Sequence, residues 1–193
     1  MSDTTTPATR DFQGLQIPTP GTYAVDTSHS ELTFSVRHMM VSKVRGRFGD
    51  VEGTVTIAED PLQSSVTASI TTASVQTGNV DRDNHLRTGD FFEAEKYPEI
   101  TFRSTRVKSH DGAEFVLEGE LTIKDVTRPV ELQVEFEGVG KSPYGFDVFG
   151  FSASTEIDRE DWGLTYNMAL ESGGVMIGKK VKIEIEGEAI RQA

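Results

Sequence analysis

The sequence contains no cysteine. Disulfide bonds, thiolate metal sites and cysteine nucleophiles are therefore excluded. Long hydrophobic runs are also missing, since no segment approaches the ~20 consecutive apolar residues that are needed to span a bilayer. Residues 1–10 have neither the basic start nor the apolar run of a secretory signal peptide. We therefore expect a cytoplasmic protein without stable membrane insertion.

Basic residues are scarce compared with acidic ones. The chain has 19 Lys and Arg against 31 Asp and Glu, which gives a net charge of −12. Such an acidic surface repels the phosphates of nucleic acids and of anionic membrane leaflets. We therefore expect no nucleic-acid partner, and we interpret the acidity as a source of solubility.

The length of 193 residues fits a single domain that buries a large core and needs no covalent cross-links to stay folded. Residues 1–20 are rich in Thr, Pro and other polar residues, which predicts a flexible N-terminal tail. Phe12, Leu15 and Ile17 form a weak apolar cluster that can dock this tail onto the rest of the chain. Residues 21–193 show no internal repeat and are expected to form one domain.

From residue 23 onward, apolar side chains recur at every second position, which is the pattern of strands with one buried face. The clearest run is 130–137, where apolar residues alternate with Glu and Gln. Eight principal runs of this kind are present, and helical periodicity is almost absent. Two stretches interrupt the pattern: 78–95 predicts a polar loop with a short helix, and 159–178 is expected to cross one end of the fold.

These strands predict an all-β protein. Each strand has an apolar face that must be covered, and the chain offers no helices to cover it. The solutions are a sandwich or a closed barrel. Several runs are long, which favours an extended eight-stranded antiparallel barrel. Phe48 and Val51 are apolar on opposite parities, which predicts a bulge or bend near Gly49.

No catalytic or metal-binding motif is recognisable. The four histidines, at positions 29, 38, 85 and 110, lack metal-ligand spacing. Asp26, His29 and Ser30 are the residue types of a hydrolase triad, but neighbours on one extended segment cannot converge as a triad requires, so a turn is favoured. Residues 81–92 open like a calcium loop but lack its glycine and its final glutamate. We expect no catalytic residue, no metal and no cofactor.

The remaining chemistry lies in the predicted interior. An eight-stranded barrel is wide enough either to be filled by its own side chains or to hold one small ligand. His38 continues the inward parity of its strand. It is either a histidine near the barrel mouth whose hydrogen bonds are satisfied within the protein, or a contact for the polar end of a ligand. The phenylalanines with inward parity are Phe34, Phe102, Phe115, Phe136, Phe149 and Phe151. Periodicity alone does not decide between a packed core and a pocket.

A series of short motifs runs in order through residues 22–190. They are Tyr23-x-Val25-Asp26-x-x-His29-Ser30, Phe34-x-Val36-x-His38, Gly46-x-Phe48 with Gly53, Asp83-x-His85-Leu86 with Asp90-Phe91-Phe92, Tyr97-Pro98-x-Ile100-Thr101-Phe102, Gly119-x-Leu121-Thr122-Ile123, Gly150-Phe151-x-Ala153 and Ile157-x-Arg159-x-Asp161-Trp162-Gly163. In this combination the chain resembles the YceI family, the lipocalin-like polyisoprenoid-binding proteins.

The resemblance implies an extended barrel, often in a homodimer, with a long apolar pocket for an isoprenoid or another long-chain lipid. Many relatives are exported to a periplasm, whereas this N-terminus resembles that of the cytoplasmic members. Phe91 and Phe92 would lie under the polar loop, either at the pocket entrance or as anchors of that loop. The pocket residues implied by the matching motifs are Phe34, Val36, His38, Phe102, Leu121, Ile123, Phe151 and Ala153.

The leading hypothesis is therefore a carrier or storage barrel for a long-chain lipid, with quinone-like or polyprenyl chains as the first ligand class. A second hypothesis is an enzyme that modifies such a lipid with His38 or His85 near the mouth. A third is a barrel with a filled core that acts through its surface in stress responses.

Overall fold

The computed structural model describes residues 6–193. One α-helix, α1 (Val80–Leu86), and three short 3-10 helices, η1 (Pro61–Gln63), η2 (Thr72–Ser74) and η3 (Arg159–Trp162), accompany the strands. The strands are β1 (Thr9–Phe12), β2 (Leu15–Pro18), β3 (Gly21–Val25), β4 (Glu31–His38), β5 (Ser42–Phe48), β6 (Val51–Ile57), β7 (Ser65–Thr71), β8 (Val75–Gln76), β9 (Glu99–Asp111), β10 (Glu114–Ile123), β11 (Val126–Lys141), β12 (Asp147–Asp158) and β13 (Ile177–Arg191). No helix in this part of the chain is long and apolar enough to cross a membrane.

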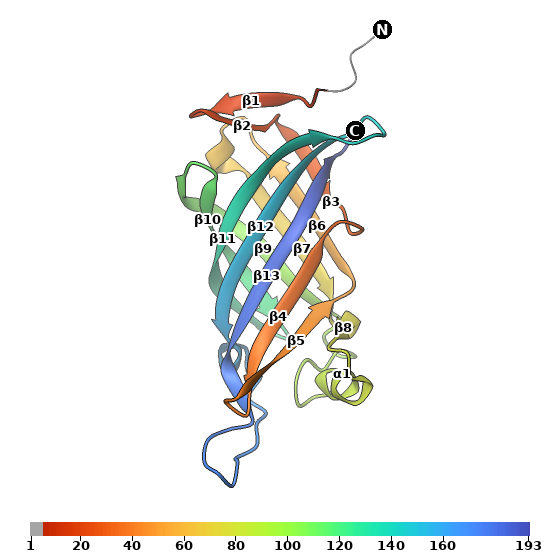
Figure 1. Ribbon diagram of the computed structural model, residues 1–193, viewed down its shortest axis with the longest axis vertical. Coiled ribbons are helices and arrows are strands. Elements are labelled where there is room, and N and C mark those ends of the chain that lie inside the picture. The colour runs from red at the N-terminus through yellow and green to blue at the C-terminus, as the bar shows by residue number, and fades with distance from the viewer. Residues whose placement is uncertain (1–5) are drawn as a thin grey trace.

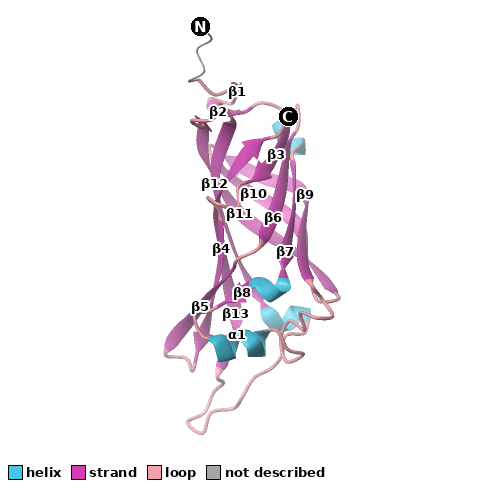
Figure 2. Ribbon diagram, turned by 90° about the vertical axis from the view of Figure 1, so that its right-hand side faces the viewer, coloured by secondary structure: helices cyan, strands magenta, loops and turns pink. Residues whose placement is uncertain are grey.

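The main sheet closes into the predicted eight-stranded antiparallel barrel (Figures 1 and 2). From β12 the order runs through β11, β10, β9, β7, β6 and β3 to β13, which pairs with β12 again. Strand β4 continues the path of β3, because β13 pairs first with β4 and, near its C-terminal end, with β3. Strand β5 likewise precedes β6 on one path, and β4 pairs with β5.

The predicted bend near Gly49 is present. Strand β5 ends at Phe48 and β6 begins at Val51, so two residues separate them. Side chains alternate between the two faces of a strand. The two residues between β5 and β6, Gly49 and Asp50, interrupt this alternation, so that the inward-facing positions shift from even to odd residue numbers. Phe48 and Val51 both face the barrel interior for this reason.

The interior contains two buried clusters. One surrounds Trp162, whose indole N–H donates to the carbonyl of Leu121 at 3.0 Å. The other surrounds Tyr23, whose hydroxyl donates to the carbonyl of Thr19 at 2.8 Å. Both polar groups are thus satisfied, which lets these large side chains be buried without loss.

The upper end of the barrel, which carries β1 and β2, corrects the expectation of a flexible tail over residues 1–20. Residues 1–5 lie outside the described part, but β1 and β2 pair as a hairpin that lies across this end (Figure 1). Arg10 donates to the carbonyls of Ala58 and Glu59, and Ile17 is buried. The apolar cluster of the segment docks, and burial of its side chains compensates for the entropy of ordering it.

The lower end, which carries α1, the β4–β5 turn and the segment between η3 and β13, agrees with the sequence in part. The short helix predicted within 78–95 is α1. Of residues 159–178, Trp162 and Leu164 are buried and belong to the core cluster that also contains Leu121. Residues 167–176 instead project beyond the strands (Figure 1).

Candidate ligand-binding site

A cavity of about 530 Å³ runs through the interior of the barrel. Its walls are the inward faces of the strands, and ten of the eleven phenylalanines line it. The volume lies within the range of pockets that hold small ligands. The cavity also shows that the barrel is not completely filled by its own side chains.

All ten residues predicted for the ligand site line this cavity. They are Phe34, Val36, His38, Phe91, Phe92, Phe102, Leu121, Ile123, Phe151 and Ala153. Period-two alternation explains the strand residues, because every second side chain of a barrel strand faces inward. Their contact with a ligand stays a prediction.

Two glycines let aromatic side chains approach the facing strand closely. A Cβ on Gly119 would lie 2.4 Å from the ring of Phe102, and one on Gly46 would lie 2.4 Å from the ring of Phe34. Only glycine allows this approach, because any other residue would push the ring further into the cavity. The two glycines therefore help to keep the cavity open.

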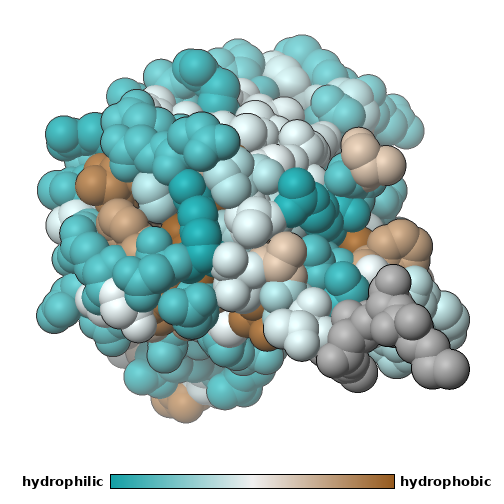
Figure 3. Space-filling model, turned by 90° about the horizontal axis from the view of Figure 1, so that it is seen from above, coloured by the Kyte–Doolittle hydropathy of each residue, from teal (hydrophilic) through white to brown (hydrophobic). Residues whose placement is uncertain are grey.

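The β1–β2 hairpin closes the upper end of the cavity. Phe12, Ile17 and Pro18 are part of its lining, and the ring of Phe12 lies 5.2 Å from that of His110. Seen from this end, hydrophilic side chains dominate the surface, and hydrophobic ones show in the gaps between them (Figure 3). The upper end is therefore covered by a segment of the chain with a polar outer surface.

An aromatic cluster closes the lower end. The ring of His85 lies 5.1 Å from that of Phe91 and 5.0 Å from that of Tyr166, and Phe91 lies 5.2 Å from Tyr166. His85 is held by a 2.8 Å hydrogen bond between its Nε2 and Asp90. The ring contacts of this cluster join the α1 loop to the segment after η3, and Tyr166 was not among the predicted site residues.

A buried arginine borders the same end of the cavity. Arg159 is 5% exposed, and its guanidinium donates to the carbonyls of Leu164, Tyr166, Ile177 and Gly178. Burial lowers the pKa of this guanidinium from its ordinary value. These bonds fix the segment between η3 and β13, a role that the sequence signalled only through the Arg159-x-Asp161-Trp162-Gly163 motif.

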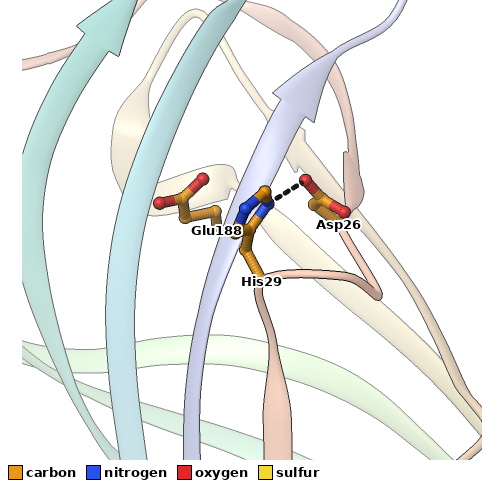
Figure 4. A group of neighbouring side chains, drawn as sticks. All are labelled: Asp26, His29 and Glu188. Carbon is orange, nitrogen blue, oxygen red and sulfur yellow. Dashed lines mark hydrogen bonds and ion pairs between the residues drawn. The ribbon is translucent and has the colours of Figure 1, made fainter. Parts of the chain in front are cut away.

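On the outer face of the barrel, Asp26, His29 and Glu188 come together (Figure 4). His29 Nδ1 lies 2.8 Å from a carboxylate oxygen of Asp26, and Ser28 donates to Asp26 through its N–H and its hydroxyl. These bonds lower the pKa of Asp26 to about 2, and the bond to Asp26 raises the pKa of His29.

This group is the predicted turn rather than a triad, because the Ser30 hydroxyl donates to the backbone carbonyl of Glu188 and not to His29. The ligand atoms of Asp26, His29 and Glu188 lie within 4.8 Å of one another, so they could hold a cation. A cation would have to displace the hydrogen bond between His29 and Asp26. Sequence spacing missed the third member, because 188 is far from 26 along the chain.

Comparison with known proteins identifies relatives of the whole barrel. A model of the YceI-like domain matches residues 23–189. The UPF0312 protein SA2479 of Staphylococcus aureus is 42% identical over 171 residues, which cover 86% of this chain and 95% of that protein.

Solved structures share the same fold. The YCEI protein of Campylobacter jejuni matches with a TM-score of 0.69 and 31% identity, over 81% of this chain and 90% of that one. Burkholderia cenocepacia BcnA has a TM-score of 0.74 at 21% identity, over 85% and 98% of the two chains. A structure described as a polyisoprenoid binding domain from Saccharophagus degradans has a TM-score of 0.67 at 16% identity, over 90% and 100%. The family model and the close relative together show that this chain belongs to the YceI-like family.

Proposed function

We propose that this protein binds one long-chain apolar lipid inside its barrel, with isoprenoid chains, quinone-like or polyprenyl, as the leading ligand class. The single observation that carries the proposal is the apolar cavity, about 530 Å³ in volume, that extends between the two ends of the barrel. The binding of a polyisoprenoid by the Saccharophagus degradans domain, as its description states, supports the choice of ligand class.

The lining suits a hydrocarbon chain. Burial of each CH₂ group is worth ~0.8 kcal/mol, so ten carbons offer ~8 kcal/mol before the costs of binding are subtracted. Aromatic side chains line the wall toward the lower end. The ring centroids of Phe34 and Phe48 are 5.7 Å apart, and those of Phe48 and Phe92 are 5.8 Å apart. Affinity in such a lining depends mainly on chain length and only weakly on the head group.

Carriage or storage without covalent chemistry fits these residues better than catalysis. The candidate catalytic side chains are His38 and His85, and both line the cavity. His85 is already held by Asp90 and packed against aromatic rings, which makes it part of the closure. We therefore assign the two histidines to the wall and the mouth of the cavity.

Native mass spectrometry of the freshly purified protein, followed by organic extraction, tests the proposal. We expect a bound species that the extract identifies as a long-chain lipid in near-stoichiometric amount. Delipidated protein should take up a polyprenyl alcohol or a quinone analogue in a one-to-one ratio. A protein that is free of lipid and takes up neither probe would contradict the proposal.

A further inference from the structure

The charge of the chain is unevenly distributed. The sequence has 31 acidic and 19 basic residues, yet 32–49 and 172–183 contain basic residues and no acidic one. These two segments form most of β4, all of β5 and the start of β13. The three strands are neighbours in the sheet, in the order β13, β4, β5. The lysines of β13 have carboxylates beside them, since Lys179 pairs with Glu160 and Lys182 with Glu184, so the excess of positive charge lies on β4 and β5.

Arg37, Lys43 and Arg45 are exposed to solvent, and Arg37 also borders the cavity. Arg37 lies directly opposite Lys43, although like charges at opposite positions destabilise a sheet. Arg45 lies opposite Ser35, whose other neighbour is Lys182. Within residues 6–193, no carboxylate lies within ion-pair distance of Arg37, Lys43 or Arg45. Their positive charges are available to an external anionic partner.

An exposed apolar surface adjoins these basic side chains at the lower end of the barrel. We call it the apolar tip, and its members are Met39, Met40, Val41, Met168 and Val175, which are exposed to 45, 62, 81, 53 and 37%. The N–H of Met39 donates to the carbonyl of Met176 at 2.8 Å, and the N–H of Met176 donates to that of Met168 at 2.9 Å. These bonds tie the β4–β5 turn to the segment before β13, and Figure 1 shows both at the lower end of the barrel.

The β4–β5 turn has a backbone that its residues do not favour. Met39 has a φ of 50° and Met40 a φ of 63°, in the left-handed region where hairpin turns prefer asparagine and glycine. Neither turn chemistry nor packing in the core accounts for two methionines at this position. An apolar contact outside the molecule would account for them.

We propose that the lower end docks onto the surface of an anionic lipid bilayer, with the apolar tip among the head groups and Arg37, Lys43 and Arg45 near the lipid phosphates. Amphipathic surfaces of this kind bind membranes through shallow apolar burial and electrostatic attraction. Long basic side chains can keep their charges at the head groups while their stems cover apolar surface. The proposal concerns docking and not insertion of the barrel.

The position of the tip connects docking to the cavity. His38, Tyr166 and Met176 line the lower part of the cavity and adjoin the apolar tip in sequence. Docking would therefore bring the aromatic closure next to the membrane, the source or destination of a long-chain lipid. Vesicle binding is nevertheless independent of whether the cavity takes up a lipid, so the two proposals fail separately.

Flotation of the full chain with vesicles tests the proposal. Vesicles of phosphatidylcholine with about a third phosphatidylglycerol should bind the protein about tenfold or more tightly than phosphatidylcholine alone, since each cation near an anionic surface contributes about fivefold. Raising the ionic strength from about 0.1 M to about 1 M shortens the Debye length from about 10 Å to about 3 Å and should remove most of this preference.

Two pairs of variants locate the surface. Met39→Ser/Met40→Ser should reduce binding about tenfold or more, whereas Tyr144→Ser/Phe146→Ser, which removes exposed aromatics from the β11–β12 turn at the opposite end, should leave it unchanged. Arg37→Gln/Lys43→Gln should weaken binding to the anionic vesicles by a similar factor. Arg103→Gln/Arg106→Gln, which removes the same charge from β9, should not.

Absence of vesicle binding by the wild-type chain would overturn the proposal, whatever the lipid content of the cavity. Equal losses in the tip variant and its control at the other end would place the contact elsewhere. A dimer in solution that dissociates on Met39→Ser/Met40→Ser, without vesicle binding, would show that the tip contacts a second copy instead. Thermal unfolding of each variant confirms that it is folded before its binding is compared.

Discussion

The two ends of this barrel are closed in different ways. At the upper end, the β1–β2 hairpin carries Ile17 into the interior and is held by hydrogen bonds from Arg10 to the backbone. At the lower end, Arg159 likewise fixes the backbone of the segment after η3, but the contact between that segment and the α1 loop depends on the rings of His85, Phe91 and Tyr166, next to an exposed apolar tip. A backbone-linked cover opens rarely, whereas side chains change rotamer readily. The difference indicates that the upper end stays closed and that a ligand enters at the lower end. We call the closed upper end the floor of the cavity and the lower end its mouth.

The comparison requires one continuous apolar wall between the two ends, and Phe102 tests this most severely. Phe102 lines the cavity, while its neighbour Arg103 lies on the outer face, where its Nη2 is 2.6 Å from Oε2 of Glu120. Phe102→Asp places an unpaired carboxylate inside and should cost several kcal/mol, whereas Arg103→Asp should cost less than about 1 kcal/mol. Chemical denaturation of both variants measures the difference. Equal small losses would contradict the inward position of Phe102.

The floor can be weakened from the upper end. Ile17 is 6% exposed, so Ile17→Ala should lower the free energy of unfolding by about 2 kcal/mol through lost burial and a residual cavity. Leu15→Ala removes a less buried side chain from the same strand and serves as the control. Denaturant titration measures both. An Ile17→Ala effect no larger than that of the control would mean that the hairpin does not close the barrel.

The mouth should respond differently. Tyr166→Ala removes two aromatic contacts, each worth about 0.5–1.5 kcal/mol, so the loss of stability should be about 1–3 kcal/mol. Exchange of bound lipid should nevertheless become about tenfold faster, because the loss of these contacts also lowers the free-energy barrier to opening the lower end. Displacement of a fluorescent lipid measures the rate, with Ile17→Ala as the comparison. Faster exchange in Ile17→Ala than in Tyr166→Ala would reverse the assignment of floor and mouth.

The smallest expected effect concerns the outer wall between the ends. Asp26 has a pKa lowered to about 2 from 3.8, so its contribution to stability is present above about pH 4 and is lost as the pH falls. His29 has a raised pKa, so its contribution is present below its ordinary value of 6.5 and is lost as the pH rises through the raised pKa. The stability difference between wild type and His29→Gln should therefore be largest between about pH 4 and 6.5. A difference that is constant with pH would show that the pair does not couple to folding.

Much of the barrel could be predicted from the sequence, since period-two alternation places residues such as Phe34 and Leu121 on the inner face without knowledge of the partners. The apolar residues of the N-terminal segment indicated that it can dock, but the β1–β2 pairing and the burial of Ile17 were not predicted, because they depend on a barrel end that local sequence does not reveal. Tyr166 was missed for a similar reason, since its partners His85 and Phe91 lie about 80 residues away along the chain. The net charge of −12 also concealed the basic region of β4 and β5, which becomes visible only when the strands are placed side by side.

Calorimetric titration of the delipidated protein with prenyl alcohols of increasing length tests the central claim most directly. A chain held inside the cavity of about 530 Å³ should bind more tightly with each added isoprene unit until the cavity is full, and the heat-capacity change of binding should become more negative in step. Phe102→Ala should weaken this dependence, since it removes part of the wall. An affinity and a heat-capacity change that do not depend on chain length would contradict the account, because the lipid would then be bound outside the barrel.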